Sequence, residues 1–198
     1  MNITGEQIAV SVAAKTNTIG FENEIAVGGV AGHFYNGFSA NAVELIESQV
    51  ENNARSKNNY VGGFVGYSNY SSYSASFSFD KMELDVDVSQ SNTTDGDTAY
   101  VGGIFGLYYV DGVENTIDRI QNSELKGDVS SSCADELYIG GAIGKLDFAE
   151  HYGGVSNENI EISKFAFVGD VKHGDCSGYT YAGGLLGEID GNGLYPSA

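Results

Sequence analysis

The feature that most constrains this chain is a short glycine motif that occurs five times. Each copy has an apolar or small residue, two glycines, two apolar or small residues and a third glycine. The copies are VGGVAG at 27–32, VGGFVG at 61–66, VGGIFG at 101–106, IGGAIG at 139–144 and AGGLLG at 182–187. Their first glycines are 34, 40, 38 and 43 residues apart. Self-similarity at such a period indicates stacked repeats, because a unit of this size cannot bury its own apolar face.

Between the glycine motifs lie segments in which apolar and polar residues alternate. The clearest are MELDVDVS (82–89), SELKGDVS (123–130) and KFAFVGDV (164–171), and each carries Asp-Val near its end. VELIESQV (43–50) is a weaker relative. Alternation with a period of two predicts strands. The stretch 40–54 has some helical character, but its place in the repeat predicts a strand there too.

Stacking of these units predicts an all-β fold, a right-handed parallel β-helix (β-solenoid) of about five repeats. Residues 1–198 then form one domain, with one irregular coil per repeat. We expect this domain to be a fragment of a larger surface protein or an assembling subunit. In such a fold the same position of every coil lies over itself, about 4.8 Å apart. A glycine column leaves room for another strand or layer to come close. The tyrosines that precede four of the motifs can stack face to face, and they are Tyr60, Tyr100, Tyr138 and Tyr181.

A small β-propeller is the alternative architecture. Kelch-type blades also carry two glycines after an apolar run. They add a later tryptophan, and this chain has none. Five blades of this repeat length would barely close a ring.

The repeats resemble the GLUG motif. The resemblance rests on YVGGFVGYSNY (60–70) and YVGGIFGLYYVDG (100–112), with IQNSELKGDV (120–129) downstream, and it covers residues 27–187. The family occurs in large secreted or surface-anchored bacterial proteins, including adhesin-like proteins and non-catalytic regions of some immunoglobulin-A peptidases. It therefore implies a right-handed β-helix and an extracellular or cell-surface location, and it carries over no catalytic residue. The chain departs from the pattern by its long intervals and by IGGAIGKLDF and AGGLLGEIDG, which lack the tyrosine after the third glycine.

The charge balance excludes several partners. The formal net charge is −18, from 27 acidic and 9 basic residues. Nucleic-acid binding needs clustered lysine and arginine, so it is not expected, and anionic membranes are disfavoured for the same reason. No stretch of about 18 apolar residues occurs, so no membrane insertion is expected. The beginning, MNITGEQIAV, has no signal-peptide pattern.

The two cysteines test the register of the repeats. Cys133 lies seven residues before Gly140, and Cys176 lies seven residues before Gly183. With one coil per repeat their Cα atoms stack at about 4.8 Å, a distance that permits a disulfide. With two coils per repeat they lie about 9.6 Å apart and cannot bond. Two free thiols in loops remain the other interpretation.

Calcium is the one cofactor with some support in the sequence. Turns such as DGDT, DGVEN and DGNG place oxygen ligands close together. The candidate ligands are Asp95, Asp97, Asp111, Asp190 and Asn192. They match neither the EF-hand loop nor the calcium-binding nonapeptide repeat, and Asp-Gly and Asn-Gly are also ordinary turn formers.

Other chemistry-bearing residues favour structural roles. The histidines His33, His151 and His173 have no partner at metal-ligand spacing, which predicts loop or edge positions. The segment KHGDCSG brings His173 near Cys176 without any protease signature around it.

The acidic pairs are Asp85 with Asp87, Asp95 with Asp97, and Asp147 with Glu150. They suit either a glycosidase pair or a solvated strand face.

The sequence thus predicts a non-enzymatic extracellular structural or adhesion module. Its variable loops would contact a glycan or a host or cell-surface protein. One alternative is a self-assembling filament subunit with end-to-end association, since open solenoid ends are exposed strand edges. A further alternative is a β-helix carbohydrate-active enzyme.

Overall fold

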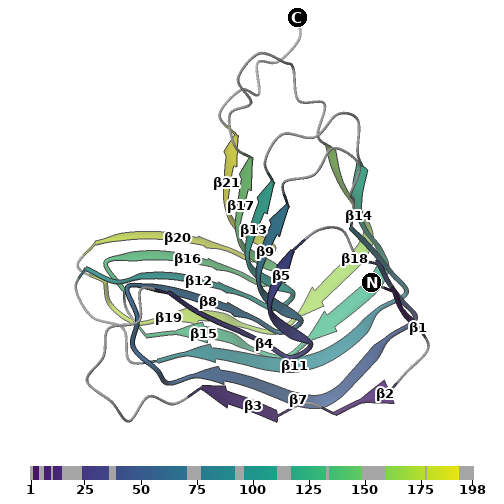
Figure 1. The fold of residues 1–198 in the computed structure, drawn as a ribbon, viewed down its shortest axis with the longest axis horizontal. Helices are drawn as coiled ribbons and strands as arrows, with labels where there is room; N and C mark the ends of the chain where they lie inside the picture. The colour runs from purple at the N-terminus through teal and green to yellow at the C-terminus, as the bar shows by residue number, and fades with distance from the viewer. Residues whose placement is uncertain are drawn as a thin grey trace, which may run out of the picture.

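The chain is an all-β parallel solenoid (Figure 1). The structure is a computed structural model, and it describes residues 2–4, 7–9, 11–14, 24–35, 39–70, 77–91, 96–110, 117–132, 134–148, 159–176 and 178–191. Within these residues the chain forms strands and no helix. The five glycine motifs stack in one column, which confirms the solenoid and rules out the propeller.

Two five-stranded parallel sheets, here called sheets B and C, contain the glycine motifs. Sheet B is built from β4 (Glu24–Gly28), β8 (Asn58–Gly62), β12 (Thr98–Gly102), β16 (Glu136–Gly140) and β20 (Tyr179–Gly183). Sheet C is built from β5 (Ala31–Tyr35), β9 (Val65–Tyr70), β13 (Phe105–Val110), β17 (Ile143–Phe148) and β21 (Leu186–Gly191). Each repeat gives one strand to each sheet, so the prediction of one coil per repeat is confirmed.

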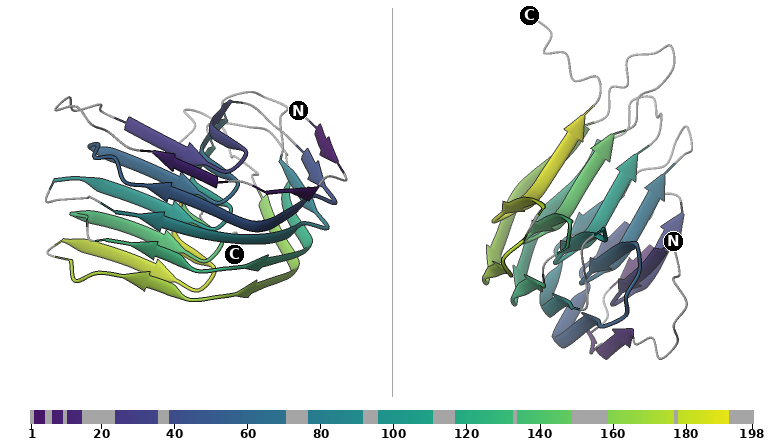
Figure 2. Two further views of the ribbon diagram at one scale, coloured as in Figure 1. Left: turned by 90° about the horizontal axis from the view of Figure 1, so that it is seen from below. Right: turned by 90° about the vertical axis from the view of Figure 1, so that its left-hand side faces the viewer.

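The alternating segments form the third sheet, sheet A, which has eleven strands. One part contains β1 (Asn2–Thr4), β6 (Ser39–Asn41), β10 (Ser78–Asp80), β14 (Ile117–Lys126) and β18 (Asn159–Val168). The other contains β2 (Gln7–Ile8), β3 (Ser11–Ala14), β7 (Glu44–Asn52), β11 (Glu83–Gln90), β15 (Val129–Ser131) and β19 (Val171–His173). The strand predicted within 40–54 is therefore confirmed as β7. Sheet A runs along the bottom and right of Figure 1, and Figure 2 shows the coils stacked one on another.

The core lies between the three sheets. Its aromatic centre contains Phe64, Phe77, Phe79 and Phe105, which meet edge to face at centroid distances of 5.0 to 5.6 Å. Columns of like residues line sheet A, because parallel register repeats each inward position in the next coil. Burial of these columns across neighbouring coils supplies the apolar surface that one repeat alone could not cover.

The glycine motif forms the corner between sheets B and C. A Cβ added to Gly102 would lie 2.1 Å from the carbonyl oxygen of Phe105 and 2.7 Å from the backbone nitrogen of Gly144. A Cβ added to Gly106 would lie 2.6 Å from the backbone nitrogen of Val61. The first and third glycines are thus required by a tight bend and by two sheets that approach backbone to backbone.

The second glycine of the motif is required by the next coil. A Cβ on Gly141 would lie 2.2 Å from the carbonyl oxygen of Gly184 and 2.6 Å from the Phe167 ring. A Cβ on Gly63 would lie 2.2 Å from the carbonyl oxygen of Gly103. The expected glycine column is therefore confirmed, and close packing of backbone explains it.

The Asp-Val pairs mark a bend in sheet A. Oδ1 of Asp87 accepts a hydrogen bond from the backbone N–H of Asp128 at 2.9 Å, and Oδ1 of Asp128 accepts one from Asp170 at 3.0 Å. Gly127, which precedes this bend, has a φ of 110°, a conformation that favours glycine. The aspartate carboxylates thus form a ladder along the bend, each bonded to the backbone of the next coil.

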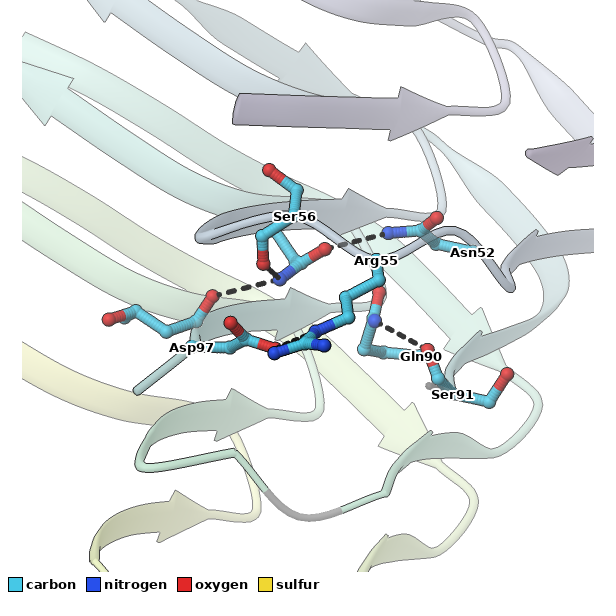
Figure 3. A network of polar contacts seen from close by, with 8 residues as sticks. Asn52, Arg55, Ser56, Gln90, Ser91 and Asp97 are labelled. Carbon is cyan, nitrogen blue, oxygen red and sulfur yellow. Dashed lines mark hydrogen bonds and ion pairs between the residues drawn. The ribbon is translucent and has the colours of Figure 1, made fainter. Parts of the chain in front are cut away.

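A buried polar network closes the turn between β7 and β8 (Figure 3). Nδ2 of Asn52 donates to Oδ1 of Asn59 at 3.3 Å, and Nδ2 of Asn59 donates to the carbonyl oxygen of Ser56 at 2.7 Å. Nε of Arg55 lies 3.3 Å from Oδ2 of Asp97 in the next coil. Buried polar groups must be paired in this way, so the network fixes the path of an otherwise irregular turn.

Substitution of the second glycine provides a matched test of this packing. We expect Gly141→Ala to lower the free energy of unfolding by about 3 kcal/mol, because the methyl group collides with backbone of the next coil. Gly184→Ala has the same motif position, but no atom lies within 4 Å of the added Cβ, so stability should stay close to wild type. Urea denaturation of dilute protein measures both. Equal losses in the two variants would contradict the packing argument.

Candidate functional site

The tyrosines before the glycine motifs form a continuous ladder on sheet B. Tyr60 and Tyr100, Tyr100 and Tyr138, and Tyr138 and Tyr181 have ring centroids 5.0, 4.9 and 5.0 Å apart, with interplanar angles of 14°, 6° and 3°. The predicted face-to-face column is therefore confirmed. Parallel register holds each ring directly over the next, at the spacing of the strands.

At the first coil the ladder crosses to sheet C. Ala26 stands where the other coils have tyrosine, and Tyr67 stacks on Tyr60 at 4.7 Å instead. His33 then stacks on Tyr67 at 4.6 Å. The small side chain of Ala26 leaves the space that the neighbouring aromatic rings use.

The ring faces of the ladder are occupied by neighbouring rings. Tyr60 and Tyr138 are only 6% and 8% exposed. Tyr181, in the last coil, is 38% exposed. A sugar that stacks on an aromatic face therefore has no open platform along the middle of the ladder.

Beside the last two rungs lies the densest charged cluster of the described residues. Nζ of Lys145 on β17 lies 3.1 Å from Asp190 and 3.2 Å from Glu188, both on β21, and 3.6 Å from Asp147. It also lies 5.0 Å from the centroid of the Tyr138 ring. The Lys145 side chain is only 10% exposed. A largely buried ammonium group thus holds together three carboxylates from two adjacent coils.

Neighbouring charges and burial shift the pKa values in this cluster. Burial lowers the pKa of Lys145, but its hydrogen bond to Asp190 and the charges of Asp147 and Glu188 outweigh burial, and the pKa lies above its usual value. Burial raises the pKa of Asp147, the Lys145 charge opposes this, and Asp190 adds to it. Lys145 therefore stays protonated at neutral pH.

The ladder tyrosines also stay protonated. Burial, followed by the charge of Glu24, raises the pKa of Tyr67 to about 12. Burial raises the pKa values of Tyr60, Tyr100 and Tyr138 as well. General acid-base catalysis needs groups whose pKa lies near the working pH, and these shifts move lysine and tyrosine away from it.

A second buried ionisable group lies where sheet C leads into sheet A. Oη of Tyr108 donates to Oδ2 of Asp118 at 2.6 Å, and the backbone N–H of Phe77 donates to Oδ1 at 2.8 Å. Burial raises the pKa of Asp118, and the two hydrogen bonds partly offset that rise. Both oxygens are used to satisfy core groups, so Asp118 acts as a structural acceptor.

Of the calcium candidates, two fall within the described residues, and both are ion-paired. Asp97 pairs with Arg55, and Asp190 pairs with Lys145. Asp95, Asp111 and Asn192 lie outside the described residues. Among the residues that the structure describes, no group of three or more His, Cys, Asp or Glu side chains can hold a metal ion. Calcium binding by the remaining turns stays a prediction.

Two of the three histidines lie on edge strands, as expected. His33 is on β5, and His173 is on β19, where Nδ1 lies 2.8 Å from the carbonyl oxygen of Gly174. His151 and Glu150 lie outside the described residues.

Asp85 and Asp87 are both exposed on the outward face of β11.

Cys176 is disulfide-bonded. The chain's only other cysteine, Cys133, lies outside the described residues. Strand register pairs Ser131 with His173 and Glu136 with Tyr179, so the segments that carry the two cysteines belong to adjacent coils. Of the two interpretations, a disulfide with one coil per repeat or two free thiols, the disulfide is confirmed.

The outer face of sheet A carries a shallow acidic hollow. It is lined by Glu44, Glu83 and Glu124, which follow one another in register, together with Asp85 and Lys126. Lys126 lies 2.8 Å from Glu124, with both side chains well exposed. This column is a solvated face of like charges, which water and salt screen.

Sequence reasoning missed the Lys145 cluster, although a signal for it existed. Lys145 and Glu188 follow the third glycines of their motifs, where the other coils have His33, Tyr67 and Leu107. Opposite charges at equivalent positions of adjacent repeats predict a contact once one coil per repeat is assumed.

Comparison with known proteins adds no family to this description. No protein-family model, no curated protein and no solved structure matches the chain. The likeness to GLUG repeats therefore rests on the motif, and the structure supports its coarser implication, a parallel β-solenoid. Within the described residues no helix has the length and apolar character of a membrane span.

Removal of the buried ammonium group tests the charged cluster. We expect Lys145→Met to lower the free energy of unfolding at pH 7 by about 2 kcal/mol, between the values for exposed and fully buried pairs. The loss should shrink at acid pH, because burial raises the pKa of Asp147, which takes up a proton as the pH falls and then no longer needs a counter-ion. Lys172→Met is the matched control, because Lys172 pairs with Asp128 and Asp170 on the surface. Denaturation curves across pH that coincide for the two variants would contradict this role.

The buried carboxyl makes a separate prediction about pH. Because the pKa of Asp118 is raised in the folded state, its contribution is most favourable below the unfolded pKa and is lost as pH rises through the folded value. Asp118→Asn keeps an acceptor for Phe77 and should remove this loss, which wild type shows as the pH rises above the unfolded pKa. Asp118→Ala removes the acceptor of two buried donors and should cost about 2 to 3 kcal/mol below the unfolded pKa, and less as the pH rises. Parallel pH profiles for wild type and Asp118→Asn would refute the assignment.

Proposed function

We propose that the chain is a non-enzymatic structural module of the cell exterior, which holds adhesive loops on a stiff solenoid. The observation that carries this proposal is the uninterrupted register of sheets B and C through all five coils. A solenoid built this way has a length set by its number of repeats, and its loops leave the same edge of every coil.

The chemistry of the described residues supports a structural role. The most perturbed tyrosines and the buried lysine are held in their protonated forms. The Lys145 cluster, the Asp118 pair and the network at Asn59 satisfy their own polar groups. Each of these groups links coils or closes a turn.

The cysteine chemistry supports an extracellular location. Cys176 is disulfide-bonded, and disulfides persist in oxidising compartments and at cell surfaces. The strongly acidic composition keeps such a surface soluble and repels nucleic acid.

Adhesion is assigned to the variable segments between sheets C and A. These are residues 36–38, 71–76, 111–116 and 149–158, which lie outside the described residues. Their lengths differ between repeats while the strands keep register, so sequence variation there leaves the scaffold unchanged.

A binding and turnover screen tests the proposal. The purified chain should bind one class of glycan or surface protein on an array. Replacement of residues 111–116 by a Gly-Ser linker of equal length should weaken that binding at least tenfold, with an unchanged far-ultraviolet circular dichroism spectrum. An equal replacement of residues 71–76 shows whether the effect belongs to one loop. Release of reducing ends or unsaturated sugars from a polysaccharide panel would instead support the carbohydrate-active enzyme.

A further inference from the structure

Among the residues that the structure describes, one glycine of the repeat motif has no close neighbour that requires a glycine there. Cβ atoms added to Gly29, Gly63, Gly103 and Gly141 would each lie 2.2 to 2.4 Å from the carbonyl oxygen of the corresponding glycine in the next coil. Gly184 is the fifth member of this column, and nothing lies within 4 Å of its added Cβ. Its φ is not in the left-handed region either. A side chain at Gly184 would be unhindered unless another coil lies over it.

The last coil presents open strand edges and uncovered apolar side chains. Among the described strands, β20 and β21 pair only with β16 and β17, and β19 pairs only with β15. The side chains that continue the buried columns into the last coil are only half-buried. Examples are Phe165, Phe167 and Leu186. Ile189 is 50% exposed, although its partner in register, Leu146, is fully buried.

We propose that this end binds the first coil of a second copy of the chain, so that copies stack head to tail as one continuous solenoid. The junction repeats the corner seen inside the molecule. There the N–H of Gly103 donates to the carbonyl oxygen of Gly141, the second glycine of the next coil, at 3.2 Å. The N–H groups of Gly63 and Gly141 donate to the first glycine of the next coil, Gly102 and Gly183, at 3.1 and 3.3 Å. By the same geometry the N–H of Gly184 donates to the carbonyl oxygen of Gly28 in the second copy.

The side chains of the two ends fit in this register. Tyr181 lies over Ala26, so the open face of the ladder meets the one coil with a small residue at that position. Glu188 lies over His33, which pairs an acid with a group that can carry positive charge. Ile189 lies over Phe34, which continues a core column.

Sheet A gives the same match. Val171 lies over Val12. The carboxylate of Asp170 lies over Ser11, whose N–H can continue the aspartate ladder. No two like charges of the described residues face each other across this junction.

The charges also select this partner over a symmetric one. A two-fold contact of the last coil with itself would bring its own acids together, and these are Glu161, Asp170, Asp175, Glu188 and Asp190. Head-to-tail contacts are heterologous and do not close, so the product is a growing filament. The proposal concerns assembly and does not depend on what the loops bind.

Sedimentation velocity over a concentration series tests the assembly. Wild type should form species that grow with concentration, and electron microscopy should show fibres with an axial rise of about 24 Å per copy, five strand layers. Gly184→Ala should stay folded and monomeric, because the methyl group meets the second copy alone. Ser89→Ala, on a middle coil, is the control and should assemble as wild type does. A wild type that is monomeric at all concentrations, or a Gly184→Ala variant that still assembles, would overturn the proposal.

A mixing experiment tests the polarity of the contact. Ile189→Lys blocks the last coil, and Tyr35→Asp blocks the first coil by setting a carboxylate over Asp190. Each variant alone should be monomeric, and an equimolar mixture should form a 1:1 dimer through the two unmodified ends. Ile46→Lys, an exposed isoleucine in a middle coil, should still form filaments. A mixture that stays monomeric, or dimers of Tyr35→Asp alone, would refute head-to-tail stacking. Loop binding measured on the monomeric variants separates this result from the adhesive function.

Discussion

The structure depends on the approach of two backbones at the corner between sheets B and C. The third glycine of each motif lies so close to the neighbouring sheet B strand that even a methyl group would overlap peptide atoms. The first glycine allows the chain to bend so tightly that it lies against the carbonyl oxygen of the residue three positions further along. Once this corner is fixed, the register of both sheets is fixed with it, because each coil must seat its glycines on those of the coil before. The tyrosine ladder and the core columns then follow from position alone.

The corner also explains why residues beside it vary. The columns that touch backbone hold one residue type, as with the motif glycines. The column after the third glycine instead holds His33, Tyr67, Leu107, Lys145 and Glu188. These side chains contact side chains rather than tightly packed backbone, both in the coils above and below and beside the column, as Tyr67 does with Tyr60 and Lys145 with Tyr138. Each must therefore suit the side chains around it, and the residue type can change from coil to coil. Aromatic rings meet at one end of the column, and opposite charges meet at the other.

The sequence predicted the fold well because its signals repeat. Five glycine motifs and three Asp-Val segments gave the strands, the stacking and the one coil per repeat. The equivalent positions of Cys133 and Cys176 left a disulfide open, and the structure gives Cys176 a disulfide bond. The site was harder, because contacts such as Tyr108 with Asp118 occur once and have no period. The division of each repeat among three sheets was not visible either, since the bends depend on hydrogen bonds such as that of Asp87 with Asp128.

A stack of identical layers has no intrinsic end, and this is the physical problem that the last coil raises. Each interaction that joins two coils inside the molecule needs one group from each coil. A glycine N–H meets a carbonyl oxygen, an aspartate carboxylate meets a backbone N–H, and one tyrosine ring stacks on another. In the last coil Gly184, Asp170 and Tyr181 provide one group of each pair, although no described strand lies beyond them. A capped end would replace these groups with polar or bulky residues that forbid continuation. Their presence means that this surface retains the stereochemistry of an interior layer.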